Sequence, residues 1–425
     1  MVPWAGSVVL ASQLLPPPLR PALPATLALD SPSALSWTAM KSTRRALFVL
    51  ALLFPSVLAP LAAKDSPKKY LLYVGTYTEK DSKGIYAFRY DAASGELTPA
   101  GLAAETTNPS FLAVDPSHRF LYAVNEVSKY NDAASGAVSA FAIDPPRGKL
   151  TLLNQLPSRG ADPCYVSLDK TGKYVLVANY AGGSAAVFPV LQDGRLGDSS
   201  AFIQLVGSSV NHERQAGPHA HWIETTADNR FVVIADLGAD QLHVYRFDPV
   251  HGALGENDPG FAALDRGAGP RHVAFHPNGK AAYVVNELNS TVTSFSYDPR
   301  RGAFSPLHTV STLQPNFSGK NSTAEIHVHP NGKFLYVSNR GDDSITVFAL
   351  DPAHGTLMTV DRVSSQGKTP RNFEIDPTGT RLFVANQATG NIVVFAIDAK
   401  TGKLTPTGQV LQVPAPVCLK FVPVD

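Results

Sequence analysis

The chain has 425 residues and a formal net charge of +1, and charged residues make up 17% of it, against roughly 25% in an average globular protein. This balance, with no basic stretch interleaved with aromatic residues, argues against a nucleic-acid partner. The 32 glycines and 34 prolines favour many short strands joined by turns, and a repeat architecture can hold a chain of this length in one domain.

The first 63 residues differ in composition from the rest. Residues 1–39 are rich in Pro, Leu and Ala, and we interpret them as translated upstream sequence or a poorly ordered extension. A packed amphipathic helix is the alternative, which Pro16 to Pro18 would interrupt. Residues 40–63 have the three parts of an export signal: a cationic start, an apolar run from Ala46 to about Leu58, and small residues around Ala63.

This export signal has consequences for location and for the cysteines. The apolar run is too short for a membrane span, so we expect cleavage near Ala63 and a periplasmic or secreted protein with no stable membrane span. The segment TRRALF at 43–48 resembles a twin-arginine signal, so the route is either this one or Sec. Oxidising compartments permit disulfides, but Cys164 and Cys418 fall on non-adjacent repeats, and we expect neither a bridge nor a nucleophile.

From residue 68 onward the chain repeats one unit seven times. Each copy contains an apolar run that ends in a polar residue, 47 to 57 residues after the previous end, and these ends are Thr76, Asn125, Asn179, Asp236, Asn286, Asn339 and Asn386. Most copies continue into an aromatic-bearing segment and a turn, such as FRYDAASGEL and FAIDPPRGKL. Short runs rich in β-branched and aromatic residues, bounded by turn dipeptides, indicate strands.

Units of about four strands, repeated seven times, predict an all-β fold: a seven-bladed β-propeller over residues 68–425. The first unit lacks the strand that follows a proline in the other units. A surplus strand of this kind, PVCLKFVP, occupies residues 416–423. We expect it to pair into blade one and close the ring, so that no sheet edge is left open.

Comparison of the seven copies separates blade-building residues from exceptions. His276 and His329 precede Pro-Asn-Gly where other copies have Asp115, Asp169 and Asp376, so both are predicted turn residues. The Asn and Asp residues at the strand ends are predicted to bond the following turn. A calcium ion held by this column in the central channel is the alternative.

Two further positions of the repeat vary from copy to copy. One directly follows the proline, and the other directly follows the polar residue at the strand end. Because one antiparallel strand starts beside the end of the next, both columns should open on one face around the channel mouth. The charged exceptions in blades four to seven are His219, Arg271, Glu287, Arg340 and Arg371; Glu126 could approach from across the ring, and Glu325, one place after its column, could join them. We predict a site there, with a ring of solvated charges as the alternative.

The chemistry of this cluster is restricted by what else the sequence holds. Arginines beside a histidine and a glutamate suit an anionic substrate whose carbonyl is polarised, with either Glu287 or His219 as general base. We find no Ser-His-Asp order, no G-x-S-x-G, no zinc-type spacing and no Gly-rich phosphate loop. His221 shares a column with apolar residues in our alignment and is predicted to be a core histidine.

Four long stretches then carry a resemblance: GPHAHWIETTADNRFVVIADLGADQLHVYRFD (217–248), GPRHVAFHPNGKAAYVVNELNSTVTSF (269–295), FSGKNSTAEIHVHPNGKFLYVSNRGDDSITVF (317–348) and PRNFEIDPTGTRLFVANQATGNIVVF (370–395). Over residues 70–425 the chain resembles the lactonase family of seven-bladed propellers, which contains the propeller-type 6-phosphogluconolactonases and, more distantly, fungal carboxy-muconate cyclases. The resemblance implies active-site positions at His219, Arg271, Glu287 and Arg340. It also implies that Glu325 and Arg371 line the same cleft and that no metal or other cofactor is required.

The resemblance implies a carboxylic-ester hydrolase that opens a sugar-acid lactone. The export signal is the one departure. Because 6-phosphogluconolactone is a cytosolic intermediate, an exported protein could instead open unphosphorylated aldonolactones. A non-catalytic propeller that binds a ligand or protein, and a cyclase that forms a muconate lactone, are the alternatives. We expect a small-molecule lactone as substrate, no nucleic-acid partner, and a monomer or weak dimer.

Overall fold

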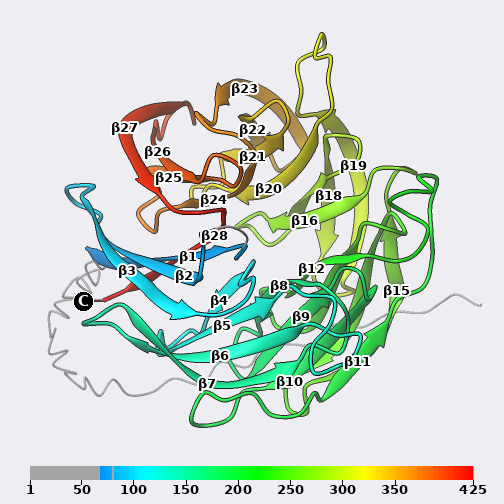
Figure 1. The fold of residues 1–425 in the computed structure, drawn as a ribbon. Coiled ribbons are helices and arrows are strands. Elements are labelled where there is room, and N and C mark those ends of the chain that lie inside the picture. Colours follow the sequence, from blue (N-terminus) through cyan, green and yellow to red (C-terminus); the bar gives the residue numbers. More distant parts are fainter. Residues whose placement is uncertain (1–67, 79–80, 425) are drawn as a thin grey trace, which may run out of the picture. The chain divides into compact units, whose positions relative to one another are not determined.

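The computed structural model describes residues 68–78 and 81–424. The interpretations of residues 1–39 and 40–63 concern segments outside these ranges. The described residues form 28 strands in seven four-stranded antiparallel sheets, which confirms the predicted all-β seven-bladed propeller (Figure 1). Within these ranges there is no helix of the length and hydropathy that crossing a membrane would require.

We number the sheets as blades 1 to 7 and give the strands of each from the inside outward. Blade 1 is β28 (Pro416–Pro423), β1 (Lys69–Thr76), β2 (Gly84–Asp91) and β3 (Leu97–Glu105); blade 2 is β4 (Leu112–Val114), β5 (Phe120–Asn125), β6 (Ala137–Asp144) and β7 (Lys149–Pro157); blade 3 is β8 (Pro163–Leu168), β9 (Tyr174–Asn179), β10 (Ser184–Pro189) and β11 (Ala201–Gln204). Blade 4 is β12 (Ala220–Thr225), β13 (Phe231–Asp236), β14 (Gln241–Asp248) and β15 (Ala253–Ala263); blade 5 is β16 (Pro270–Phe275), β17 (Ala281–Asn286), β18 (Thr291–Asp298) and β19 (Ala303–Ser311). Blade 6 is β20 (Ser322–Val328), β21 (Phe334–Arg340), β22 (Ser344–Asp351) and β23 (Thr356–Ser364); blade 7 is β24 (Pro370–Ile375), β25 (Arg381–Asn386), β26 (Asn391–Ile397) and β27 (Leu404–Gln412).

The ring closes as the sequence predicts. Strand β28 pairs antiparallel with β1, with Leu72 opposite Phe421, so blade 1 combines the last strand of the chain with the first three. The first strands of successive blades also contact one another around the whole ring, including β28 with both β24 and β4. Figure 1 shows the red C-terminal strand beside the blue β1.

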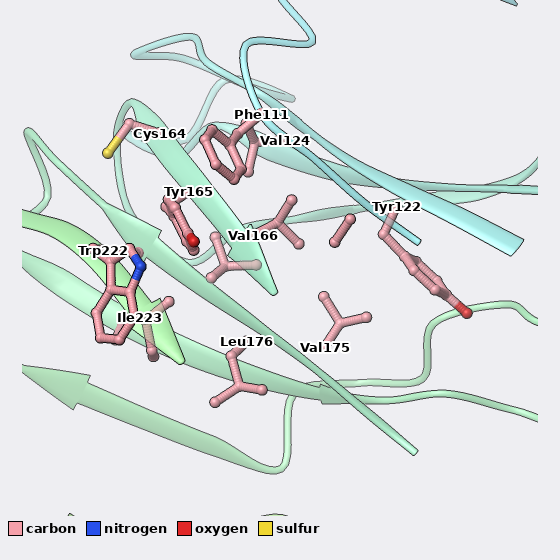
Figure 2. Packing of buried hydrophobic residues seen from close by; sticks show 14 of the residues in the cluster. Phe111, Tyr122, Val124, Cys164, Tyr165, Val166, Val175, Leu176, Trp222 and Ile223 are labelled. Carbon is pink, nitrogen blue, oxygen red and sulfur yellow. The ribbon is translucent and has the colours of Figure 1, made fainter. Parts of the chain in front are cut away.

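Apolar side chains between neighbouring blades form the core. Strand β9 is buried at every position, because both faces of its blade are covered, and covered strands have continuous apolar runs. Near the centre, rings from successive blades pack together. The centroids of Phe111 and Tyr165 lie 4.1 Å apart, and those of Tyr165 and Trp222 lie 6.0 Å apart (Figure 2).

The turn histidines have the predicted structural role and also link blades. His276 Nδ1 accepts a hydrogen bond from the backbone of Asn278 at 3.1 Å, which fixes the turn, and its Nε2 donates to the carbonyl of Gly332 in blade 6 at 2.8 Å. His329 makes the corresponding bond to the carbonyl of Gly379 in blade 7, also at 2.8 Å. These two residues therefore have no part in the candidate site.

The Asn residues at the ends of the second strands also have a structural role. Asn125, Asn179 and Asn386 are buried and donate from Nδ2 to backbone carbonyls just upstream of their own blade's first strand. They thus fix the connections into blades 2, 3 and 7. In the part of the chain that the structure describes, no group of three or more His, Cys, Asp or Glu residues is arranged to hold a metal ion.

Candidate active site

A β-bulge at the start of the first strand directs side chains toward the site. In β16, Pro270 pairs with Asn286 and His272 with Val285, which leaves Arg271 out of the ladder. The same irregularity releases Cys164, His221 and Arg371 in blades 3, 4 and 7. A bulge turns the extra residue away from the regular alternation, so these side chains project at the same end of their blades.

This geometry corrects the alignment of blade 4. The backbone N–H of Leu237 bonds the carbonyl of His219, whereas the equivalent N–H of Glu287 bonds that of Gly269. His219 therefore corresponds to Gly269, and His221, not His219, occupies the bulge position of Arg271. His221 is buried, as predicted for a core histidine. Its assignment to the apolar column was wrong, because it occupies the bulge position and its Nε2 lies 3.9 Å from Glu287 Oε2. The error arose because we aligned Pro218 with Pro270, while pairing in blade 4 begins two residues later, at Ala220.

Glu287 is the centre of the cluster. Its Oε2 accepts from Arg271 Nε at 3.0 Å and pairs with Arg340 Nη2 at 2.9 Å, and its Oε1 accepts from Arg214 Nη2 at 2.7 Å. Burial alone would raise the pKa of Glu287, but the surrounding guanidinium groups hold it well below its usual value. Glu287 is therefore ionised at neutral pH.

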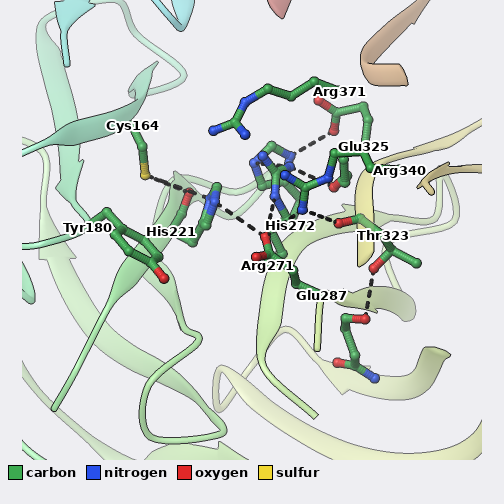
Figure 3. A network of polar contacts seen from close by, with 12 residues as sticks. Cys164, Tyr180, His221, Arg271, His272, Glu287, Thr323, Glu325, Arg340 and Arg371 are labelled. Atoms are coloured by element: carbon green, nitrogen blue, oxygen red, sulfur yellow. Dashed lines mark hydrogen bonds and ion pairs between the residues drawn. The ribbon is translucent and has the colours of Figure 1, made fainter. Parts of the chain in front are cut away.

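The arginines differ in exposure. The side chains of Arg271 and Arg340 are 3% and 12% exposed, whereas Arg214 is 41% exposed. Burial, together with the neighbouring Arg271 and Arg371, lowers the pKa of Arg340 to about 10, which still leaves it charged at neutral pH. Arg340 Nη2 also donates to the carbonyl of Thr323 at 2.7 Å, while its Nε is buried without a partner (Figure 3).

His219 lies at the edge of this cluster. Its ring stacks on Tyr180, with centroids 4.4 Å apart, and its Nδ1 lies 2.9 Å from the carbonyl oxygen of Tyr180. Tyr180 in turn accepts a hydrogen bond from Arg214 at 2.9 Å, which links His219 to Glu287 through two side chains. The ring of His221 packs edge-on against Tyr180, with centroids 5.5 Å apart. Burial, aided by Arg271 and His272, keeps the pKa of His221 well below the usual value.

Arg371 and Glu126 meet through a residue that the sequence reasoning did not select. Arg371 Nη2 donates to the hydroxyl of Tyr77 at 2.8 Å, and this hydroxyl donates to Glu126 Oε2 at 2.9 Å. Arg371 belongs to blade 7, Tyr77 follows β1 of blade 1 and Glu126 follows β5 of blade 2, so these contacts link the C-terminal blade to the first two blades. Arg371 is partly buried, and although this desolvation opposes its charge, Tyr77, Glu126 and Glu287 together raise its pKa.

Glu325 lies apart from Glu287. Its two oxygens bond His272 Nδ1 at 2.8 Å and Asn372 Nδ2 at 2.5 Å. Although burial opposes ionisation, His272 and Arg271 hold the pKa of Glu325 below its usual value. The structure thus brings Arg271, Glu287 and Arg340 into direct contact and links His219 to Glu287 through Tyr180 and Arg214. Tyr77 joins Arg371 to Glu126 in a separate group of contacts.

Sequence reasoning missed Arg214, Tyr180, Tyr77 and His272. Arg214 lies in the segment between β11 and β12, outside the repeat, so a comparison of blades could not find it. Its neighbour Gln215 anchors that segment, because it is buried and donates to Leu237 O and Asp240 Oδ1. Tyr77 and Tyr180 follow strand-end residues in the same column as Glu287, and this shared position was an available signal.

The cysteines are free and buried. Burial raises the pKa of both thiols, in line with the prediction that neither is a nucleophile.

These features define a propeller in which several guanidinium groups surround one ionised carboxylate at one end of the inner strands. Residues 71–421 match the family described as "Lactonase, 7-bladed beta-propeller", and the chain belongs to that family. It is 41% identical over 354 residues to a 6-phosphogluconolactonase of Bacillus subtilis, which covers 83% of this chain and 99% of that protein.

Solved structures agree with this assignment. The periplasmic gluconolactonase of Pseudomonas aeruginosa is 36% identical with a TM-score of 0.78, covering 84% of this chain and 100% of that one. A protein of Bacteroides fragilis is 40% identical with a TM-score of 0.78, covering 85% of this chain and 99% of that one.

An uncharacterized protein of Lactococcus lactis is 35% identical over 311 residues, which is 72% of this chain and 85% of that one.

Proposed function

We propose that the chain hydrolyses a sugar-acid lactone, 6-phosphogluconolactone or a related aldonolactone, to the open acid by general acid/base and arginine electrostatic catalysis. The observation that carries this proposal is the cluster of Arg214, Arg271 and Arg340 on ionised Glu287. Preorganised cationic donors stabilise the oxyanion formed when water attacks an ester carbonyl, generally the largest single contribution in such reactions. The names of the B. subtilis and P. aeruginosa proteins support the same substrate class.

In this mechanism Arg271 and Arg340 polarise the lactone carbonyl, and His219 transfers protons. A carbonyl oxygen can only accept, so His219 Nδ1 carries the hydrogen that bonds Tyr180 O, and the neutral ring has its lone pair on Nε2. Nε2 takes a proton from the attacking water and returns one to the ring oxygen when the C–O bond breaks. Glu287 is a weak base while three guanidinium groups hold it ionised, so its part is electrostatic.

Arg371 and Glu126 are proposed to bind the rest of the substrate. A guanidinium can bind a carboxylate or phosphate at two points, and Arg371 uses Nη2 on Tyr77. A carboxylate such as Glu126 accepts hydrogen bonds from sugar hydroxyl groups. Together Arg214, Arg271, Arg340 and Arg371 exceed Glu287 and Glu126 in charge, which favours an anionic substrate.

We also propose export to the periplasm or secretion, with the signal from about Met40 removed near Ala63. The predicted three-part signal supports this, and the similar P. aeruginosa protein is named periplasmic. Determination of the mature N-terminus after expression in a bacterial host tests it. Retention of residues 40–63 in the cytoplasmic fraction would contradict it.

A lactone panel tests the activity. Purified protein is incubated with gluconolactone and with its 6-phosphate, and acid release above the spontaneous rate is followed at constant pH. We expect release with at least one of them, and its loss in Arg271→Ala. Binding of both lactones without acid release would instead indicate a non-catalytic propeller. Closure of a muconate to its lactone, with no sugar lactone opened, would indicate a cyclase.

A further inference from the structure

A second layer of side chains lies directly below the bulge residues. At equivalent positions in or next to the seven first strands lie Cys418, Phe111, Tyr165, Trp222, His272, Glu325 and Asn372, and all seven are buried. Four of these are aromatic or thiol side chains. The other three, from consecutive blades 5, 6 and 7, are polar, and packing does not require polar residues in this layer.

These three polar residues form one chain of hydrogen bonds. Asn372 Oδ1 accepts from the backbone of Leu419 at 3.0 Å, which ties the chain to the closing strand β28. Asn372 Nδ2 donates to Glu325 Oε2 at 2.5 Å, and Glu325 Oε1 accepts from His272 Nδ1 at 2.8 Å. The backbone N–H of Ile326 also donates to Glu325 Oε1 at 3.1 Å. The buried carboxylate is thereby satisfied without a substrate.

The chain ends on a residue of the candidate active site. A carboxylate only accepts, so Glu325 requires the proton of His272 to be on Nδ1. In the neutral ring, His272 Nε2 is then an acceptor, and it lies 3.2 Å from Arg271 Nη1. Arg271 is thus held in three directions: by Glu287 through Nε, and by Ala324 O and His272 Nε2 through Nη1 (Figure 3).

We infer that His272 and Glu325 are positioning residues that fix the guanidinium of Arg271 for the reaction, with Glu325 acting through His272 and not on the substrate. The inference rests on the proposed function, because it assigns a purpose to a fixed Arg271. Carboxylate–histidine pairs orient catalytic and metal-binding groups elsewhere by the same means, since the partner of one ring nitrogen decides the state of the other.

Two substitutions of His272 separate positioning from packing. Asn places an N–H near the position of Nδ1, so His272→Asn keeps the bond to Glu325 and loses the acceptor for Arg271. Gln places its carbonyl oxygen near the position of Nε2, so His272→Gln keeps that acceptor and loses the donor to Glu325. We expect the Gln variant to be the less stable of the two and yet the more active.

The expected kcat of His272→Asn is lower by about 10- to 100-fold, the range for a hydrogen bond to a charged group, with KM within about threefold. His272→Gln should keep kcat within about threefold of the unsubstituted protein. A purely structural role makes activity follow stability, so greater activity in the Asn variant, or equal activity in both, would overturn the inference. Cys418→Ala, in the same layer but outside the chain of bonds, is the control for disturbance of the layer.

A measurement without substrate keeps this test separate from the proposed function. ¹⁵N NMR of histidine-labelled protein at pH 7, with the His272 signals assigned by their absence in His272→Gln, reports which ring nitrogen carries the proton. We expect a neutral ring with the proton on Nδ1. A proton on Nε2 would contradict the positioning scheme even if the lactone panel succeeds. The expected tautomer without any lactone opened would refute the proposed function alone.

Discussion

At the scale of single residues, the site concentrates positive charge around one carboxylate. Glu287 contacts three guanidinium groups, and two of them are almost fully buried. A buried charge without a partner is strongly destabilising, whereas in a complete buried pair the attraction between the charges offsets much of the cost of burying them. Removing Glu287 and removing one arginine should therefore have different effects on folding, although both should impair catalysis.

Arg271→Ala should lower kcat/KM for a gluconolactone by at least about a hundredfold, the usual effect of losing a donor to the oxyanion. Folding should be preserved, because Glu287 keeps Arg214 and Arg340 as partners. Steady-state kinetics and circular dichroism check this. Arg246→Ala, an exposed arginine on β14, is the matched control and should keep full activity.

Glu287→Ala should lower kcat/KM at least as much and also destabilise the fold by about 3–5 kcal/mol, the typical cost of breaking a buried ion pair. Denaturant unfolding measures the second effect. If Glu287→Ala and Arg271→Ala both hydrolysed the lactone at the normal rate, the assignment of this cluster as the active site would be wrong.

The buried histidines predict how stability depends on pH. Burial, partly offset by Glu325, lowers the pKa of His272 to about 4, against about 6.5 in an unfolded chain. Between these values the unfolded state binds a proton that the folded state excludes, so stability falls as pH decreases from about 6.5 to 4, by about 3 kcal/mol for this residue. His221 acts in the same direction, and Glu287 and Glu325 add a further loss below about pH 4.5.

Urea unfolding midpoints between pH 8 and pH 4 test this dependence. We expect a plateau above about pH 7 and a decline below it. In His272→Gln the substituted side chain cannot take up a proton. The decline in stability should therefore be smaller by the contribution of His272, about 3 kcal/mol. An equally steep decline in the variant would show that His272 does not titrate as expected.

At the scale of the strand, the repeat explains what the sequence predicted and what it did not. Blade number, strand order and ring closure follow from apolar runs and turns, which recur in every copy and are set by packing. The positions of Arg271, Glu287 and Arg340 also follow, because they are charged exceptions in a regular pattern. The alignment of His219 and His221 with the other blades could not be predicted from the sequence. It depends on the bulge at the start of β12, which arises from backbone pairing and is not marked by a particular residue type.

The turn between the first two strands of a blade provides a test at this scale. His276→Ala removes a hydrogen bond within the turn and one to Gly332 of the next blade. We expect a loss of about 1–3 kcal/mol in unfolding free energy, at about 0.5–1.5 kcal/mol for each bond. Lactone hydrolysis at saturating substrate should be unchanged, because this turn lies at the opposite end of β16 from Arg271.

His276→Asp is the matched variant, since aspartate occupies this position in other blades and accepts from the turn backbone, as Asp169 does from Thr171 and Lys173. His276→Asp should recover the stability contributed by the hydrogen bond within the turn, but not that contributed by the bond to the carbonyl of Gly332. A drop in kcat for either variant, with the fold intact, would mean that the turn is coupled to the site.

At the scale of the whole propeller, blade 1 depends on both ends of the described chain. Strand β28 pairs with β1 along nearly its whole length, and it supplies the backbone N–H that Asn372 accepts from. Loss of β28 would leave β1 as an open inner edge and would also remove the anchor of the hydrogen-bond chain that ends at Arg271.

Deletion of residues 414–425 should therefore abolish cooperative thermal unfolding and lactone hydrolysis together. Removal of Asp425 alone, outside β28, should change neither. Differential scanning calorimetry and the lactone assay check both. A truncated protein that still unfolded in one sharp transition would show that blades 2 to 7 together with β1, β2 and β3 suffice for cooperative folding.

The pairing of β1 with β28 also bears on passage through a membrane. A chain threaded with its N-terminus first delivers β28 after the other described strands, so blade 1 stays incomplete until β28 has crossed the membrane. A chain carried across already folded must instead complete blade 1 in the cytoplasm. Under the proposed export, the route of translocation therefore decides on which side of the membrane β28 pairs with β1.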